Sequence, residues 1–181
     1  MMSCHSLPYG VCTGRQGVDD CAGARRIVDA AERTHRCMVA PERVAVTILG
    51  TAQDGGVPQP GCMLPCCRTE KGEARRVRHP VALGLTDTTG TRHLFEASRA
   101  LAGQDEIWGK ADGRDLSSLR SLWLTHGHLG HIDGLGLFGC EAMGMKDIDL
   151  YCSQSMLELL RNTPTLNRLL TDNNLNPTTF D

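Results

Sequence analysis

Short apolar runs separated by polar turns predict five strands in the chain. Residues 43–50, RVAVTILG, are rich in β-branched side chains and end in glycine, as a buried strand often does. The runs 81–87 and 92–97 flank a Thr-Gly pair, which is typical of a hairpin turn. Further strands are expected at about 121–125 and within 147–152.

Other segments have the composition and spacing of helices. The apolar pattern predicts one helix over residues 131–144, despite its glycines. Ser153 can cap a helix over 153–162 with its hydroxyl, and a short helix followed by a polar tail is expected over 163–180. This order of strands and helices predicts a mixed α/β domain.

The chain divides into two parts of different character. Residues 1–42 predict an N-terminal extension that is irregular apart from one helix over 21–35. Residues 43–181 contain the predicted strands and form the domain. Within it, the segment 51–67 holds three glycines and three prolines and predicts a loop, and the charged segment 68–78 is expected to be short helix or coil.

The composition limits the classes of partner. The formal net charge is −2 and aromatic residues are 4% of the chain, so no nucleic-acid surface is expected. No apolar run approaches the roughly 18 residues of a membrane span, and the N-terminus lacks the pattern of a secretory signal. The nine cysteines are therefore expected to be reduced thiols or metal ligands, and a cytoplasmic location is expected.

Three of the seven histidines fall within the segment LTHGHLGHIDG, residues 124–134. His126 and His128 are two residues apart on an extended segment and point the same way, and His131 can join them after the chain turns. Neutral imidazole is a good ligand for zinc, with iron and manganese as alternatives. We therefore expect the three side chains to bind a metal ion, rather than to be unrelated surface or core histidines.

A second cluster, GCMLPCC, lies in the loop that follows the first strand. The thiolates of Cys62, Cys66 and Cys67 are close in sequence and can act as soft ligands for a structural zinc ion. Three free thiols in a reducing compartment are the alternative, and the sequence alone does not decide between the two.

The segment LTHGHLGHIDGL resembles the His-x-His-x-Asp-His metal motif of the metallo-β-lactamase superfamily. The stretch VTILGTAQDGGVPQPGC is similar to the opening of one branch, which contains the pyrroloquinoline quinone biosynthesis protein B relatives and the phosphodiesterase-like PhnP proteins. HLFEA lies between them, where the family has a strand that ends in an acid. The resemblance extends over residues 44–152.

The resemblance implies a four-layer αβ/βα sandwich with metal ions in the cleft between two sheets. His126 and His128 would bind a first ion and His131 a second, so one or two ions of zinc, or of iron or manganese, are implied. The family's acid in this motif binds the second ion and orients the attacking water, but Gly130 stands at its position here. A single-metal site, or an acid from another segment, is then implied.

Three acids are candidates for that role. Asp54 is the catalytic candidate, because its loop lies near the cleft in the family; an Asx-turn within its own loop is the alternative. Glu96 ends the HLFEA strand and is expected to line the cleft or to mark a strand end. Asp133 is expected to cap the start of a helix and complement its dipole.

Relatives in the same branch bind a structural zinc ion through a Cys-x-Cys-x-x-Cys loop. Cys62 and Cys67 keep the outer spacing, whereas Leu64 stands at the middle position and Cys66 is its candidate substitute. His79 is a candidate fourth ligand, or the fourth ligand is absent.

No histidine follows His131, although the family's full site uses later histidines and a bridging aspartate. The chain therefore resembles the first half of such a domain. It is expected to be a metal-dependent hydrolase of the ester or phosphodiester class, with a small-molecule substrate. The alternatives are a non-catalytic metal-binding remnant, a half-domain that needs a homodimer or a complementing chain, and a role related to quinone cofactor biosynthesis.

Overall fold

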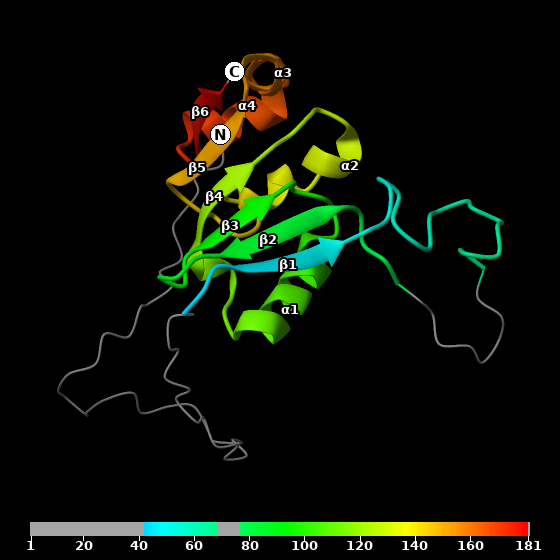
Figure 1. The fold of residues 1–181 in the computed structure, drawn as a ribbon. Coiled ribbons are helices and arrows are strands. Elements are labelled where there is room, and N and C mark those ends of the chain that lie inside the picture. The colour runs from blue at the N-terminus through cyan, green and yellow to red at the C-terminus, as the bar shows by residue number, and fades with distance from the viewer. Residues whose placement is uncertain (1–41, 69–76, 181) are drawn as a thin grey trace, which may run out of the picture. The chain divides into compact units, whose positions relative to one another are not determined.

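The computed structural model describes residues 42–68 and 77–180, which contain one six-stranded sheet (Figure 1). The order of the strands across the sheet is their order along the chain. The strands are β1 (Ala45–Gly50), β2 (Ala82–Thr86), β3 (Arg92–Phe95), β4 (Leu119–Trp123), β5 (Ile148–Ser153) and β6 (Leu175–Phe180). The predicted extension over residues 1–42 lies outside the described residues, apart from Glu42.

The sheet is mixed. β1, β2 and β3 are antiparallel neighbours, so the predicted hairpin is confirmed, and β3 to β6 are parallel. Parallel neighbours need crossover connections. These contain α1 (Leu101–Asp112), η1 (Leu116–Ser118), α2 (Leu129–Ile132), η2 (Leu135–Phe138), α3 (Gln154–Asn162) and α4 (Pro164–Thr171). No helix in this part of the chain is long and apolar enough to cross a membrane.

One face of the sheet forms the core with the helices. Leu94, Leu122 and Leu150 are paired across β3, β4 and β5 and are completely buried. Trp108 of α1 packs so closely on β2 that a Cβ atom at Gly84 would lie 2.6 Å from Cδ2 of the indole. Each Å² of apolar surface buried in this way stabilises the fold by about 25 cal/mol, so this face holds the helices on the sheet.

A buried arginine joins α1 to β3. Arg92 is completely buried, and its guanidinium pairs with Asp105 at 2.9 Å and with Asp112 at 2.5 Å. It also lies 4.4 Å from the centre of the Trp108 ring. Burial raises the pKa of Asp112, but hydrogen bonds from Arg92 and Thr86 outweigh this effect and hold the pKa below its usual range.

The opposite face of the sheet, called the open face below, carries an apolar row that is partly exposed. Phe95, Trp123 and Tyr151 are paired across β3, β4 and β5, and their successive ring centres are 5.7 and 4.1 Å apart. Successive residues of a strand point to opposite faces, so this row lies on the side away from the buried core. On β1, Val46 and Ile48 are 59% and 65% exposed.

Two predictions about elements need correction and one helix was missed, whereas the five predicted strands lie within two residues of their expected bounds. The single helix expected over 131–144 is wrong: α2 and η2 are separate short pieces, and Gly134 between them lies so close to the backbone of Ser98 that only glycine fits. The polar tail expected after the last helix contains β6, which pairs with β5 along its whole length. α1 was not predicted, because its sequence, with glycines at 103 and 109, has weak helical periodicity.

Candidate metal centre

The histidines of the predicted motif lie at the carboxyl edge of the parallel strands. β4 ends at Trp123, and the segment 124–128 leads from it into α2, which contains His131. α2 is tied to the residues just after β3, because the backbone N–H of Ala97 donates to the carbonyl of His131 at 2.8 Å. The ends of two buried strands therefore position the histidine segment.

His126 lies beside both other histidines of the motif, and the binding of one metal ion by all three stays a prediction. His126 Nε2 and His128 Nδ1 are 3.2 Å apart, and the ring centres of His126 and His131 are 4.1 Å apart. Two nitrogen ligands of one tetrahedral zinc ion, each at about 2.0–2.1 Å, lie about 3.3 Å from each other. The separation between the first two histidines therefore suits a shared ion. Both are exposed, and His131 is half-buried, so the cluster opens to solvent.

Glu96, directly after β3, lies on the Nδ1 side of two histidines. Its Oε1 accepts hydrogen bonds from the backbone N–H and the hydroxyl of Thr125, at 3.2 and 2.5 Å. The Thr125 hydroxyl oxygen lies 2.8 Å from Nδ1 of His126, and Oε2 of Glu96 lies 3.5 Å from Nδ1 of His131. This carboxylate favours a proton on each Nδ1, and both Nε2 atoms are then available as metal ligands.

The backbone of Glu96 is strained. Its φ is 68°, in the left-handed region, which a residue other than glycine occupies at a cost of roughly 1–2 kcal/mol. Its N–H donates to the carbonyl of Trp123 at 2.9 Å, so a hydrogen bond to β4 helps to hold this conformation. Backbone strain is concentrated at functional sites, and here it places a buried carboxylate beside the histidines.

The donor atoms fit a divalent transition metal ion. One donor atom from each of Glu96, His126 and His131 lies within 4.8 Å of the other two. Oε2 of Glu96 and Nδ1 of His131 are buried and make no hydrogen bond, although buried polar atoms are normally paired. A cation on Nε2 of His131 would favour a proton on Nδ1 and so a hydrogen bond between these two atoms, which lie 3.5 Å apart. Imidazole nitrogen and carboxylate oxygen are ligands of zinc, iron and manganese.

Asp54 approaches the cluster from the loop after β1. Its Oδ1 lies 3.5 Å from Nε2 of His131, the ring nitrogen that does not face Glu96. It also lies against Gly130, where a Cβ atom would be 2.5 Å from the Cα and Cγ atoms of Asp54. Asp54 and Glu96 are thus the two sequence-predicted acids that reach the histidines.

Asp133 has a different role from the one predicted. It lies at the C-terminal end of α2, so the prediction that it caps a helix start is wrong. Its Oδ1 accepts a hydrogen bond from the N–H of Arg99 at 2.7 Å, and its Oδ2 lies 2.5 Å from Nε of the same residue. The carboxylate ties the end of α2 to the segment after β3.

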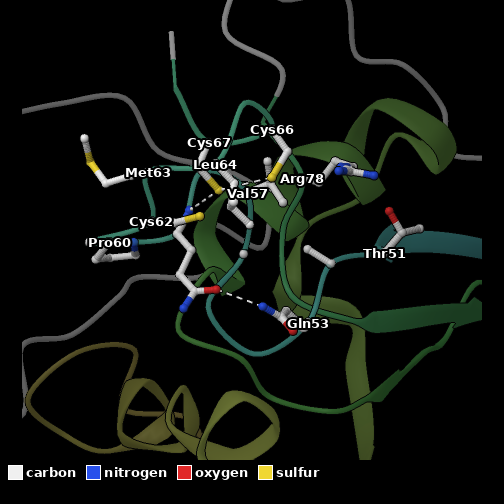
Figure 2. Close-up of a pocket in the computed structure, with 14 residues that line it drawn as sticks. Thr51, Gln53, Val57, Pro60, Cys62, Met63, Leu64, Cys66, Cys67 and Arg78 are labelled. Carbon is white, nitrogen blue, oxygen red and sulfur yellow. Dashed lines mark hydrogen bonds between the residues drawn. The ribbon is translucent and has the colours of Figure 1, made fainter.

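The second cluster lies in the loop between β1 and β2, where three sulfur atoms gather at one pocket (Figure 2). The Sγ atoms of Cys62, Cys66 and Cys67 lie within 4.8 Å of one another. The backbone N–H of Gln59 donates to Sγ of Cys67 at 3.3 Å and lowers the pKa of that thiol. The hydrogen bond with Cys67 raises the pKa of Cys66. The three sulfurs are close enough for a soft ion to bind between them.

His79, the candidate fourth ligand, packs elsewhere. A Cβ atom at Gly103 of α1 would lie 2.7 Å from its ring, so the imidazole faces that helix. Leu64, at the middle position of the loop, is exposed, and its carbonyl accepts the N–H of Cys67 at 2.9 Å. Within residues 42–68 and 77–180, the sulfur cluster therefore has three protein donors. A structural ion in it stays a prediction.

Two curated proteins resemble this chain, whereas no family model matches it. The chain is 29% identical over 115 residues to an octanoyltransferase of Porphyromonas gingivalis, across 64% of this chain and 22% of that protein. It is 27% identical over 131 residues to the coenzyme PQQ synthesis protein B of Rhodopseudomonas palustris, across 68% of this chain and 40% of that protein. The chain thus spans less than half the length of these curated relatives.

Two solved structures share the arrangement of strands and helices. Zinc-bound PqqB from Methylobacterium extorquens superposes with a TM-score of 0.63 at 24% identity, over 75% of this chain and 45% of that one. A diphosphatase from the PhnP family superposes with a TM-score of 0.54 at 19% identity, over 77% of this chain and 51% of that one. The chain therefore has the metallo-β-lactamase fold that the sequence resemblance implies, over about half the length of those structures.

Proposed function

We propose that the histidine cluster binds one or two divalent transition metal ions, zinc first among them, for the hydrolysis of an ester or phosphodiester bond in a small molecule. The observation that carries this proposal is the convergence of His126, His128 and His131 at the end of β4, with Glu96 on their Nδ1 side. Two structures of similar fold support it, because one is a zinc-bound protein and the other is a diphosphatase.

The chain's own residues supply the ligands and their orientation. A bound metal ion would contribute Lewis acidity towards a phosphoryl or carbonyl oxygen. Thr125 and Glu96 fix the ring tautomers that present Nε2 of His126 and of His131. The exposed side of the cluster leaves a substrate free to approach.

Turnover of three substrate classes tests the proposal: a phosphodiester, a diphosphate and a carboxylic ester. Each is assayed with metal-free protein and with protein reloaded with zinc, iron or manganese. We expect metal-dependent turnover of at least one class, and its loss in His126→Ala/His128→Ala. His79→Ala is the matched control, because it removes an imidazole that faces α1, and it should keep its turnover. Equal turnover in the double variant would contradict the proposal.

Metal binding without turnover would favour the alternatives, which are a non-catalytic metal-binding protein or a half-domain that needs a second chain. A role related to quinone cofactor synthesis is a second candidate function. The likeness to the coenzyme PQQ synthesis protein B in sequence, and to zinc-bound PqqB in structure, favours it. Growth of a strain that lacks its own PQQ synthesis protein B, with and without this chain, tests that candidate.

A further inference from the structure

We infer that Asp54 is a metal ligand of the histidine cluster, and that residue 130 is glycine because the side chain of Asp54 occupies the space beside it. The inference rests on the proposed metal centre. It assigns to that centre an acidic ligand from the loop after β1, which is a different segment from the one that carries the histidines.

The first observation is how two carboxylates flank one imidazole. Oε2 of Glu96 lies 3.5 Å from Nδ1 of His131, and Oδ1 of Asp54 lies 3.5 Å from Nε2 of the same ring. Oε1 of Glu96 is bound to Thr125, which fixes this carboxylate on the Nδ1 side of the ring. Asp54 faces the other ring nitrogen, and a cation between Oδ1 and Nε2 would satisfy both atoms.

The second observation concerns the alternative role of Asp54. In an Asx-turn its carboxylate would accept the N–H of Gly56, two residues further on. That N–H instead donates to the carbonyl of Gln53 at 2.8 Å. The backbone of the loop thus closes its own turn, and the Asp54 side chain, which is 48% exposed, is free to act outside it.

The third observation is the contact with Gly130. A Cβ atom there would lie 2.5 Å from both Cα and Cγ of Asp54 and would overlap its Cβ. Gly130 lies within α2, where glycine is less favourable than alanine, so space rather than backbone conformation explains the glycine. A side chain at 130 and the side chain of Asp54 exclude each other.

The fourth observation is the charge and pairing of the donors. Neutral imidazoles bring no negative charge to a divalent cation, and a carboxylate supplies it. The donors form two close pairs, His126 with His128 at 3.2 Å and His131 with Asp54 at 3.5 Å. With Asp54 the cluster therefore offers two donors to each of two neighbouring ions.

Cobalt(II) titration of the full chain tests the inference, because its absorption bands separate nitrogen and oxygen ligation from thiolate ligation. We expect Asp54→Asn to weaken cobalt binding at the histidine cluster by more than about 100-fold, above the 10–100-fold that loss of an outer-shell partner produces. Asp133→Asn is the matched control, since that acid is bound to Arg99, and it should bind like the wild type. Wild-type affinity and spectrum in Asp54→Asn would overturn the inference.

An exchange of the two positions tests the role of Gly130. Gly130→Asp alone should lower the melting temperature, because its side chain overlaps Asp54. Asp54→Gly/Gly130→Asp should bind cobalt at least about 10-fold more tightly than Asp54→Gly, since it returns one carboxylate to the same space. A double variant that binds cobalt no more tightly than Asp54→Gly would contradict the inference that side chains at 54 and 130 share one space beside the metal ion. These readouts record metal binding, so a wild type that binds metal without turnover would sink the hydrolase proposal and leave this one standing.

Discussion

The histidine cluster and the cysteine cluster each gather three metal-ligand side chains, but the chain holds them in different ways. The histidines follow β4, in the parallel part of the mixed sheet, and Glu96 and Thr125 contact them from the ends of β3 and β4. The cysteines lie on a loop that pairs with a distant segment through backbone hydrogen bonds between Val57 and Arg78. The cysteine segment itself is held by local hydrogen bonds, such as those from Gln59 N–H to Cys67 Sγ and from Cys67 N–H to the Leu64 carbonyl. Packed strands therefore position the histidine cluster, whereas hydrogen bonds within the loop position the cysteine cluster.

This difference predicts that loss of metal has a different consequence at each cluster. Without its ion, the histidine cluster still rests on β3 and β4, whose core residues are buried independently of any metal. Without its ion, the cysteine loop loses the contacts that would order it, so its binding free energy is in part folding free energy. Metal loss should therefore affect chemistry at one cluster and local structure at the other.

The largest effect is expected at the cysteine loop. If the free concentration of the ion is about 100 times its Kd, loss of binding in Cys67→Ser should lower the free energy of unfolding by about 2.7 kcal/mol. Thermal melting with and without a chelator measures it, and the chelator should bring the wild type close to the variant. Cys140→Ser, an exposed cysteine outside the loop, is the control. Equal melting of wild type and Cys67→Ser in both conditions would leave three free thiols.

The next effect concerns the support of the histidines. Glu96→Gln keeps the shape of the side chain but removes the charge that favours a proton on Nδ1 of His131, so metal affinity should fall by about 10–100-fold. Thr125→Val should give a smaller loss, because it breaks only the link to His126. Competition with a coloured chelator measures both. Unchanged affinity in Glu96→Gln would mean that the neighbouring strand end contributes nothing to metal binding by the histidines.

A third test asks whether the open face of the sheet that supports the histidines is covered by a second copy of the chain. The open face exposes Val46 and Ile48 beside its aromatic row, and we expect it to associate with a second copy of the chain. Burying one such side chain contributes about 1.5–3 kcal/mol, so Ile48→Lys should weaken self-association by roughly 10–100-fold. Sedimentation equilibrium measures the dissociation constant. A wild type that stays monomeric at high concentration would contradict the expectation.

The smallest effect is expected in the turn between β2 and β3, far from either cluster in the sequence. Hydrogen bonds from the hydroxyl and N–H of Thr89 and the N–H of Thr91 lower the pKa of Asp87 to about 2. A lowered pKa stabilises the fold above the unfolded value of about 3.9, and this contribution is lost as the pH falls through the folded value. Asp87→Asn should cost about 1 kcal/mol at neutral pH.

The pH dependence of melting supplies the control for that prediction. The difference between wild type and Asp87→Asn should shrink as the pH is lowered from about 4 to about 2. Metal content at both clusters should stay unchanged near neutral pH. A difference that is constant across this range would show that the Asp87 charge does not stabilise the turn.

Local sequence patterns were sufficient to predict much of the fold, but partners distant in sequence were not visible in them. Ser153 was expected to cap a helix, and its hydroxyl accepts the N–H of Met156 at the start of α3. The segment LNPTTF looked like a polar tail because it contains proline and no apolar alternation, yet it forms β6 because the edge of β5 is available to pair with it. Long-range pairing overrode local propensity there.

The same distinction applies to the candidate site. The close spacing of His126, His128 and His131 was enough to name them as a candidate site, and His126 lies beside each of the other two. The link from Glu96 to Thr125 depends on two strands becoming neighbours, and the contact of Asp54 with Gly130 joins a loop to a helix that is distant in sequence. Sequence reasoning could name these acids, but only the packed strands show which nitrogen each one faces.

The left-handed backbone at Glu96 places opposing demands on one position as the sequence evolves. Glycine or asparagine tolerates a φ of 68° better than glutamate does, but neither carries the carboxylate. A lineage that no longer used the metal centre would gain stability by replacing the glutamate with glycine or asparagine, and no selection would oppose that mutation. The residue found at this position in descendants of the same gene would therefore report, independently of the histidines, which of them are still under selection for the metal.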